Sequence, residues 1–232
     1  MARKSLGMEC QLCHEVLSKG TILSHLKKCI CIQAESPTIH AAPAKQESLF
    51  WLKVEGFDDK QYCIYLQVKK SAQLVDLDLF LRNLWLECCG HLSQFIINGE
   101  FYISMPETDD EDDKDMYVKL KSVLDVGLAF IHEYDFGSTT TLKITVIDER
   151  MGLRQKGKVK LLARNVAPSY QCANCGKLAT VICVNCLYEH EKETFLCDDC
   201  IDEHECGDEG LLPVVNSPRM GVCGYTGETD LD

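Results

Sequence analysis

A regular array of cysteines in the last quarter of the sequence most constrains this chain. Eight of the fifteen cysteines fall between Cys172 and Cys223. Three Cys-x-x-Cys pairs are followed by a histidine and one more cysteine, and each pair can form a tight turn that chelates one metal ion. Eight ligands make two tetrahedral zinc sites, and so short a segment has too little apolar core to fold without metal. In order, the ligands are Cys172, Cys175, Cys183, Cys186, Cys197, Cys200, His204 and Cys206.

The order of these ligands is similar to that of B-box and related cross-brace fingers. In such fingers alternate pairs share a metal ion, so the resemblance implies one site of Cys172, Cys175, Cys197 and Cys200. It implies a second site of Cys183, Cys186, His204 and Cys206. The step from His204 to Cys206 is unusually short, and His190 competes for a place in the second site. Neither site leaves an open coordination position, which argues against catalytic zinc.

A second array near the N-terminus has the pattern of a single zinc finger. Cys10 and Cys13 form a pair, and His25 and Cys29 follow one helical turn apart. A helix over residues 21–28 would carry His25, and Cys31 is an alternative to Cys29. The expected total is therefore about three zinc ions per chain. An iron–sulfur cluster is disfavoured because its cysteine spacings usually differ.

Charge and hydropathy restrict the compartment and the partners. No apolar run approaches the roughly 20 residues of a membrane span, and residues 1–15 lack the apolar region of a secretory signal. We therefore expect a cytoplasmic protein, whose cysteines bind metal rather than form disulfides. Residues 167–232 carry 13 acidic and 3 basic side chains, so this segment should repel nucleic acid.

The composition divides the chain into four segments. Residues 1–32 form a zinc-finger-like module, 33–48 a linker, 49–166 an α+β domain, and 167–232 the double-zinc module with its tail. The expected fold is a central mixed or antiparallel sheet with packed helices, flanked by two small zinc-binding modules. The hydrophobic periodicity predicts a helix over 72–89 and strands over 62–69, 95–97, 101–104, 128–134, 141–147 and 157–164.

The middle domain resembles a family named for the third open reading frame of an Ri plasmid. The matching pieces span about 61–148, and the most recognisable is Tyr134-Asp135-Phe136-Gly137. Members are also labelled insertion-element passenger proteins, and the family occurs in bacteria and archaea. The resemblance implies a compact α+β domain without a settled activity. After this run the family usually has an acidic residue, Trp and His, where this chain has Ser138, Thr140 and Leu142.

The sequence therefore favours a non-enzymatic protein that binds zinc and contacts other proteins. One alternative is a nucleic-acid-associated factor of a mobile element. It would use the N-terminal finger, with Lys19, Lys27 and Lys28, and the basic strand Lys156–Arg164. The other alternative is a hydrolase that uses a cleft of the middle domain. It is least favoured, because this chain lacks the acidic residue, Trp and His that usually follow the Tyr-Asp-Phe-Gly run in the family.

The remaining cysteines and histidines are not predicted to be metal ligands. Cys63, Cys88 and Cys89 fall on the expected strand and helix and are interpreted as core residues. His91 and His132 have no partner at ligand spacing and are interpreted as structural. Cys223 lies in a glycine-rich loop; a reactive thiol there would need a neighbouring base, which the sequence does not specify.

Overall fold

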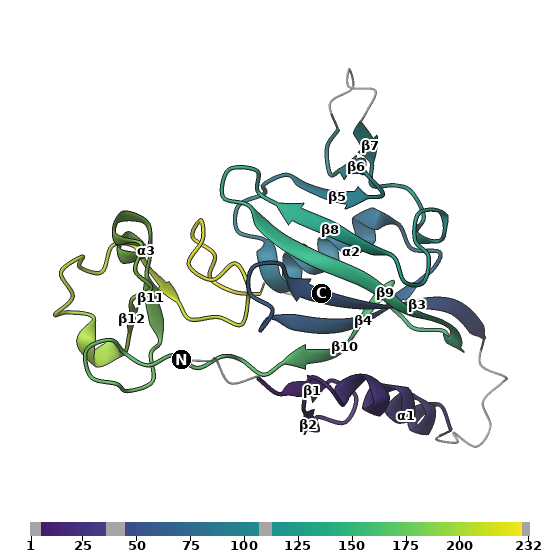
Figure 1. Ribbon diagram of the computed structural model, residues 1–232, viewed down its shortest axis with the longest axis horizontal. Coiled ribbons are helices and arrows are strands. Elements are labelled where there is room, and N and C mark those ends of the chain that lie inside the picture. The colour runs from purple at the N-terminus through teal and green to yellow at the C-terminus, as the bar shows by residue number, and fades with distance from the viewer. Residues whose placement is uncertain (1–5, 36–44, 107–112, 229–232) are drawn as a thin grey trace. The chain divides into compact units, whose positions relative to one another are not determined.

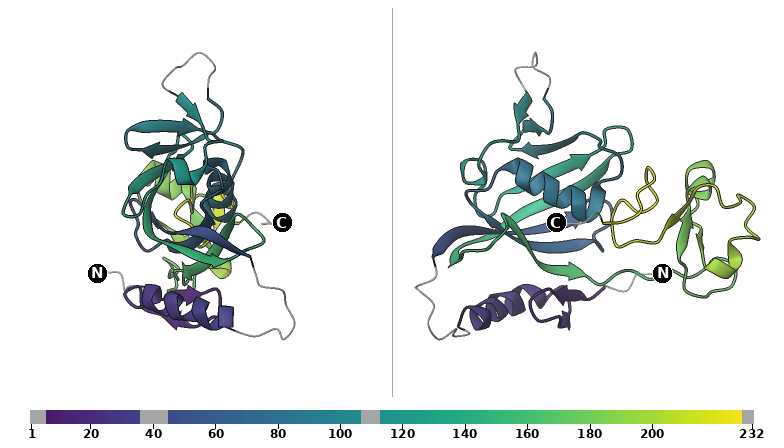
Figure 2. Two further views of the ribbon diagram at one scale, coloured as in Figure 1. Left: turned by 90° about the vertical axis from the view of Figure 1, so that its right-hand side faces the viewer. Right: turned by 180° about the vertical axis from the view of Figure 1, so that it is seen from behind.

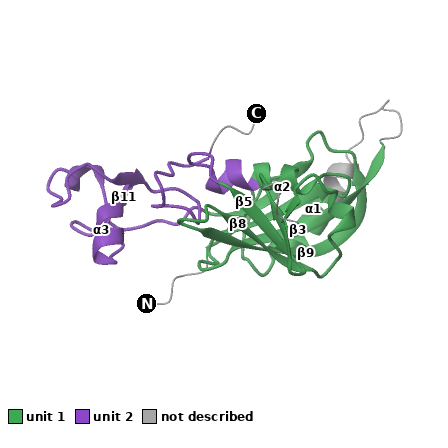
Figure 3. Cartoon of the chain, turned by 90° about the horizontal axis from the view of Figure 1, so that it is seen from above, with its two compact units in different colours: residues 1–80, 92–166 green, residues 81–91, 167–232 purple. Residues whose placement is uncertain are grey.

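The computed structural model describes residues 6–35, 45–106 and 113–228, and only the backbone of 31–35. Most of the expected linker and the side chain of Cys31 therefore lie outside the described residues. The chain divides into two compact units, which Figure 3 shows in two colours. The first unit contains residues 1–80 and 92–166, and the second contains 81–91 and 167–232. The second unit thus takes in a short internal segment that the sequence analysis assigns to the middle domain.

The first unit is built on a ten-stranded mixed sheet (Figure 1). The strand order is β2-β1-β10-β4-β3-β9-β8-β5-β6-β7, and all neighbours are antiparallel except β6 and β7. The turn between β5 and β6 has positive φ at both Asn98 and Gly99, as the predicted hairpin requires. The strands are β1 Met8–Cys10, β2 Val16–Leu17, β3 Gln46–Gly56, β4 Cys63–Lys69, β5 Ser93–Ile97, β6 Glu100–Ile103, β7 Asp113–Asp115, β8 Ala129–Tyr134, β9 Thr140–Leu153 and β10 Val159–Asn165.

The core of the first unit lies between the sheet and helix α2 (Leu74–Leu81), which covers one face of it (Figure 2). Phe95, Phe130 and Ile144 are buried sheet residues. The His132 ring on β8 lies 2.8 Å from Asp78 on α2, and both side chains are buried. A short 3-10 helix, η2 (Leu120–Ser122), follows β7. This unit therefore has a substantial apolar core of its own.

The N-terminal residues join this sheet instead of forming a separate module. Strand β1 pairs with β10, with Cys10 opposite Ala163. Helix α1 (Ile22–Glu35) lies beside β1 in both Figures 1 and 2. Its buried Ile22 and Leu26 pack in one cluster with Trp51 of β3. The helix also continues to Glu35, past the expected boundary at residue 32.

The helix expected over 72–89 ends earlier than its hydrophobic stripe indicates. After α2 the chain widens into a π-helical turn, η1 (Arg82–Leu86), in which the Glu87 N–H donates to the Arg82 carbonyl at 2.7 Å. Glu87 then adopts an extended conformation. The stripe residues Leu84 and Trp85 are buried as expected, but Cys88 and Cys89 lie in the irregular segment that follows. Such π-turns occur frequently at functional sites.

Two short elements and a three-stranded sheet make up most of the second unit. The sheet has the order β12-β11-β13, and the Tyr170 and Phe195 rings stack at 4.0 Å between centroids. The apolar clusters here are small; one contains Ala179, Ile182 and Phe195. The elements are β11 Val181–Cys183, α3 Val184–His190, β12 Phe195–Leu196, η3 (a 3-10 helix) Asp198–Cys200 and β13 Leu211–Pro213.

The predicted fold class is confirmed in its main features. The chain is mostly sheet, with a large mixed sheet and a few helices, as an α+β protein should be. Among the described residues, no helix combines the length and the hydropathy needed to cross a membrane.

Candidate metal centres

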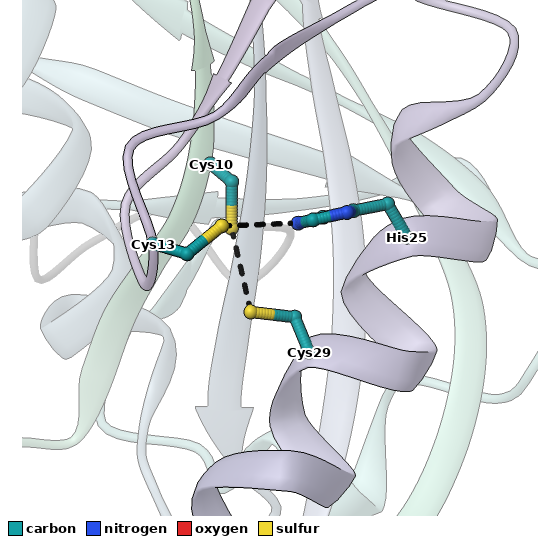
Figure 4. Close-up of side chains that lie close together, drawn as sticks. All are labelled: Cys10, Cys13, His25 and Cys29. Carbon is teal, nitrogen blue, oxygen red and sulfur yellow. Dashed lines mark hydrogen bonds between the residues drawn. The ribbon is translucent and has the colours of Figure 1, made fainter.

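The structure brings the four N-terminal ligands together. The ligand atoms of Cys10, Cys13, His25 and Cys29 all lie within 4.8 Å of one another, and Figure 4 shows the side chains pointing toward a common centre. The Cys13 sulfur lies 3.3 Å from His25 Nε2, and the Cys10 and Cys29 sulfurs are 4.0 Å apart. Zinc–sulfur bonds of about 2.3 Å at tetrahedral angles place two sulfurs about 3.8 Å apart. The separations therefore suit a four-coordinate ion.

A tight turn and a helix position these four side chains. The His14 N–H donates to the Cys10 carbonyl at 2.7 Å, and His14 has a φ of 62°. This closes the loop between the first two ligands. Ser18 begins the helical segment by accepting the N–H groups of Thr21 and Ile22, so that His25 and Cys29 project from one face of α1.

A carboxylate lies next to the ring nitrogen of His25 that faces away from the other ligands. Glu15 Oε2 lies 3.6 Å from His25 Nδ1, while Nε2 faces the sulfurs. This distance is long for a hydrogen bond, but the negative charge orients the ring with Nε2 toward the ligand centre. Carboxylates in this position are usual behind metal-binding histidines.

The cross-braced pairs of the second unit also come together. One quartet contains Cys172, Cys175, Cys197 and Cys200. Its Cys175 and Cys197 sulfurs are 3.5 Å apart. The loop closes as in the first unit, because the Gly176 N–H donates to the Cys172 carbonyl and Gly176 has a φ of 74°.

The other cross-braced quartet contains Cys183, Cys186, His204 and Cys206. Cys186 lies 3.5 Å from His204 Nε2 and 3.7 Å from the Cys206 sulfur. His190 lines the same pocket as Cys186, His204 and Cys206, but it is not part of the group within 4.8 Å. Cys206, not His190, therefore completes this quartet.

The thiols in these groups perturb one another's ionisation. Hydrogen bonding to Cys186, followed by burial, raises the pKa of Cys206 to about 12. In the finger, burial and then a hydrogen bond to Cys13 raise the pKa of Cys29 to about 12. Backbone N–H groups, led by that of Cys175, lower the pKa of Cys172 to about 6. Crowded thiols of this kind ionise together only when a cation offsets their charge, as a bound divalent metal does.

The structure also contains a fourth group, which was not predicted from the sequence. Cys88, Cys89, His91 and Cys223 also place their ligand atoms within 4.8 Å of one another. The expectation that Cys88 and Cys89 are core residues is wrong, since Cys88 is half-buried and Cys89 is exposed. Only Cys63 of that set is fully buried, and burial raises its pKa to about 11. The group contains no Cys-x-x-Cys pair, and its one local spacing signal is Cys88-x-x-His91, so the interpretation of His91 as lacking a partner at ligand spacing is wrong.

Comparison with known proteins gives little further information. No protein-family model and no curated protein matches the chain. A crystal structure of a protein of unknown function from Methanosarcina mazei Go1 is similar, with a TM-score of 0.43 and 18% identity. The match covers 56% of this chain and 76% of that one. The resemblance to the Ri-plasmid family stays a prediction.

Proposed function

We propose that this chain is a zinc-binding, non-enzymatic protein that contacts other proteins. In this proposal the finger quartet and the two cross-braced quartets each hold one structural Zn²⁺ ion. The observation that carries it is that each quartet supplies four Cys or His ligand atoms within 4.8 Å. Four protein ligands satisfy tetrahedral zinc and leave no position for a substrate or an activated water.

The charge distribution supports a protein partner over a nucleic acid. In the finger, two of the basic side chains face carboxylates: Lys19 lies 2.9 Å from Glu55, and Lys27 lies 3.2 Å from Asp148. The Lys158 ammonium lies 2.8 Å from Asp76. Paired lysines offer less to phosphate, because contact would require them to leave their partners. The net negative charge of residues 167–232 acts in the same direction.

One pocket favours the nucleic-acid alternative. Arg150, Arg154 and Lys160 line it together, with Gln67 and Gln155. It contains no cysteine, histidine or carboxylate among its lining residues, so it offers no acid or base for hydrolysis. Three cations around a hollow of mixed polarity suit a phosphate or another anion. If the chain binds nucleic acid, this pocket next to β10 is where the contact should lie.

The hydrolase alternative gains no comparable support. In the Tyr-Asp-Phe-Gly run, the Asp135 carboxylate accepts the Gly137 N–H at 3.0 Å. Phe136 is exposed. The run therefore forms the turn between β8 and β9, where a carboxylate stabilises the backbone.

A capture experiment with matched variants tests the protein-partner proposal. Zinc-loaded wild type, Cys186→Ser and Cys63→Ala would each be cross-linked and analysed by mass spectrometry. We expect a partner that wild type and Cys63→Ala capture and that Cys186→Ser does not. The reason is that, of the two substituted cysteines, only Cys186 is a ligand in a quartet. Identical capture by all three proteins would contradict a zinc-dependent interaction surface.

A gel shift at two salt concentrations tests the nucleic-acid alternative. We expect no retardation of duplex or single-stranded DNA by the full chain at either concentration. Retardation at low salt that Arg154→Glu and Lys160→Glu abolish would favour the alternative, because charge reversal removes the phosphate contacts.

A further inference from the structure

The fourth Cys/His quartet has ligand separations like those of the other three. The Cys89 sulfur lies 3.7 Å from that of Cys88 and 3.9 Å from that of Cys223. His91 Nε2 lies 3.0 Å from Cys89 and 3.2 Å from Cys223. The sulfur separations match the roughly 3.8 Å of two thiolates on one tetrahedral zinc ion. They are far longer than the roughly 2.05 Å of a disulfide bond.

The backbone around these ligands turns sharply, as it does at the other quartets. Gly90, directly after Cys89, has a φ of 79°, and Gly224, directly after Cys223, has a φ of 69°. His14, Gly176 and Gly207 hold the same position after ligand cysteines of the other three groups, and all have positive φ. The shared left-handed residue redirects the chain so that it passes around a common centre.

Cys223 itself is held in an unfavourable conformation. Its φ is 48°, which costs a residue with a β-carbon roughly 1 kcal/mol. In a segment of consecutive turns, a left-handed cysteine next to a left-handed glycine directs the thiol toward residues 88–91. Non-glycine residues of this kind persist where other interactions compensate them, frequently at binding sites.

A buried arginine lies beside the quartet. Arg219 is fully buried, and its Nη2 donates to the Cys88 sulfur at 3.5 Å. Zinc held by three thiolates and a neutral imidazole carries one net negative charge. The positive guanidinium beside Cys88 offsets that charge. The charges therefore suit the metal-bound form of this group.

Further hydrogen bonds hold the segment that contains Cys223 next to the segment that contains Cys88, Cys89 and His91. The Ser217 hydroxyl donates to the Trp85 carbonyl at 2.6 Å, and the Tyr225 hydroxyl donates to the Leu84 carbonyl at 3.4 Å. The π-turn leaves carbonyls of this segment available for such bonds. All these residues belong to the second unit, so residues 217–225 and 81–91 form one local structure.

We propose that Cys88, Cys89, His91 and Cys223 bind a fourth Zn²⁺ ion, which fastens the C-terminal segment 217–225 to the internal segment 81–91. Three sulfurs and one imidazole nitrogen form a set that structural zinc favours. This ion is more accessible than the other three, since Cys89 and Cys223 are both exposed. It should therefore be the first to leave when a chelator is added.

Metal counting on matched variants of the full chain tests this proposal. Elemental analysis should give about four zinc ions for wild type and about three for Cys223→Ala or His91→Ala. Cys63→Ala and His190→Ala are the controls, and they should keep the wild-type content. Cys223→Ala with unchanged zinc content would overturn the proposal. Failure of the three-zinc proposal would be distinguishable, because substitution of Cys13, Cys175 or Cys186 would then leave the zinc content unchanged.

A measurement on the unaltered protein guards against variants that misfold. With zinc bound, Cys89 and Cys223 should react with iodoacetamide at least about tenfold more slowly than after chelation, because coordination occupies the sulfur. Peptide mapping assigns each alkylated position. Equal rates before and after chelation would overturn the proposal, as would a Cys89–Cys223 disulfide in the freshly purified protein.

Discussion

The finger of the first unit and the cross-braced segment of the second use the same ligand turns in different surroundings. The finger residues pack onto a ten-stranded sheet, and Met8 and Leu26 are buried in a cluster with Trp51. The cross-braced segment has a sheet of three short strands, and in one of its two small buried clusters three of the four buried residues are ligand cysteines. Zinc should therefore add only moderately to the stability of the finger, whereas the cross-braced segment should not fold without it.

The largest effect is expected when a ligand cysteine of the cross-braced segment is replaced. Cys175→Ser should unfold residues 167–215, because structural zinc contributes about 10 kcal/mol or more to small folds of this type. Limited proteolysis should then digest this segment and leave a resistant fragment that contains residues 45–165.

Cys13→Ser is the matched variant, since both residues are the exposed second cysteine of a pair. It should lose one zinc ion but lower the free energy of unfolding of the first unit by only about 1–3 kcal/mol. Equal protease sensitivity of the first unit in both variants would contradict the difference between the two regions.

An effect smaller than that of Cys175→Ser should follow from removing a buried polar contact in the core of the first unit. Asp78→Ala removes the acceptor of the buried His132 ring and should destabilise the first unit by about 2–4 kcal/mol, because a buried polar group is left unsatisfied. Asp78→Asn retains an acceptor oxygen and should cost less. Chemical denaturation measures both, and zinc content should not change. A loss of zinc in Asp78→Ala would mean that core and metal sites are coupled.

The smallest effect concerns the left-handed residue after a ligand cysteine. Gly176 has a φ of 74° and open space around it, so Gly176→Ala should weaken zinc binding about fivefold, through roughly 1 kcal/mol of backbone strain. His14→Gly should act in the opposite direction at the finger. Competition with a zinc-binding dye measures both affinities. Gly20→Ala, at a glycine without positive φ, is the control; a loss there equal to that of Gly176→Ala would contradict the backbone explanation.

Some of the fold follows from patterns that the sequence displays plainly. The hairpin at Asn98-Gly99 and strand β8, whose burial alternates, were predictable because alternation and turn residues are local signals. Strand β3 was not predicted, since Leu49 to Leu52 are all buried and a continuous apolar run lacks the alternating period. The early end of the helix at Leu86 was also not predictable, because the hydrophobic stripe continues to Cys88.

The sequence by itself predicted the three quartets that contain Cys-x-x-Cys pairs, but it left Cys31 as an alternative to Cys29 and His190 as a competitor in the second cross-braced site. Two cysteines with two residues between them can bring their own thiols together through a local turn. The tertiary structure alone decided the fourth quartet, where Cys223 meets Cys88, Cys89 and His91 from more than a hundred residues away. It also decided that the finger joins a large sheet, because pairing of β1 with β10 depends on contacts between distant segments. Such contacts have no fixed spacing, so they become visible only when the chain is folded.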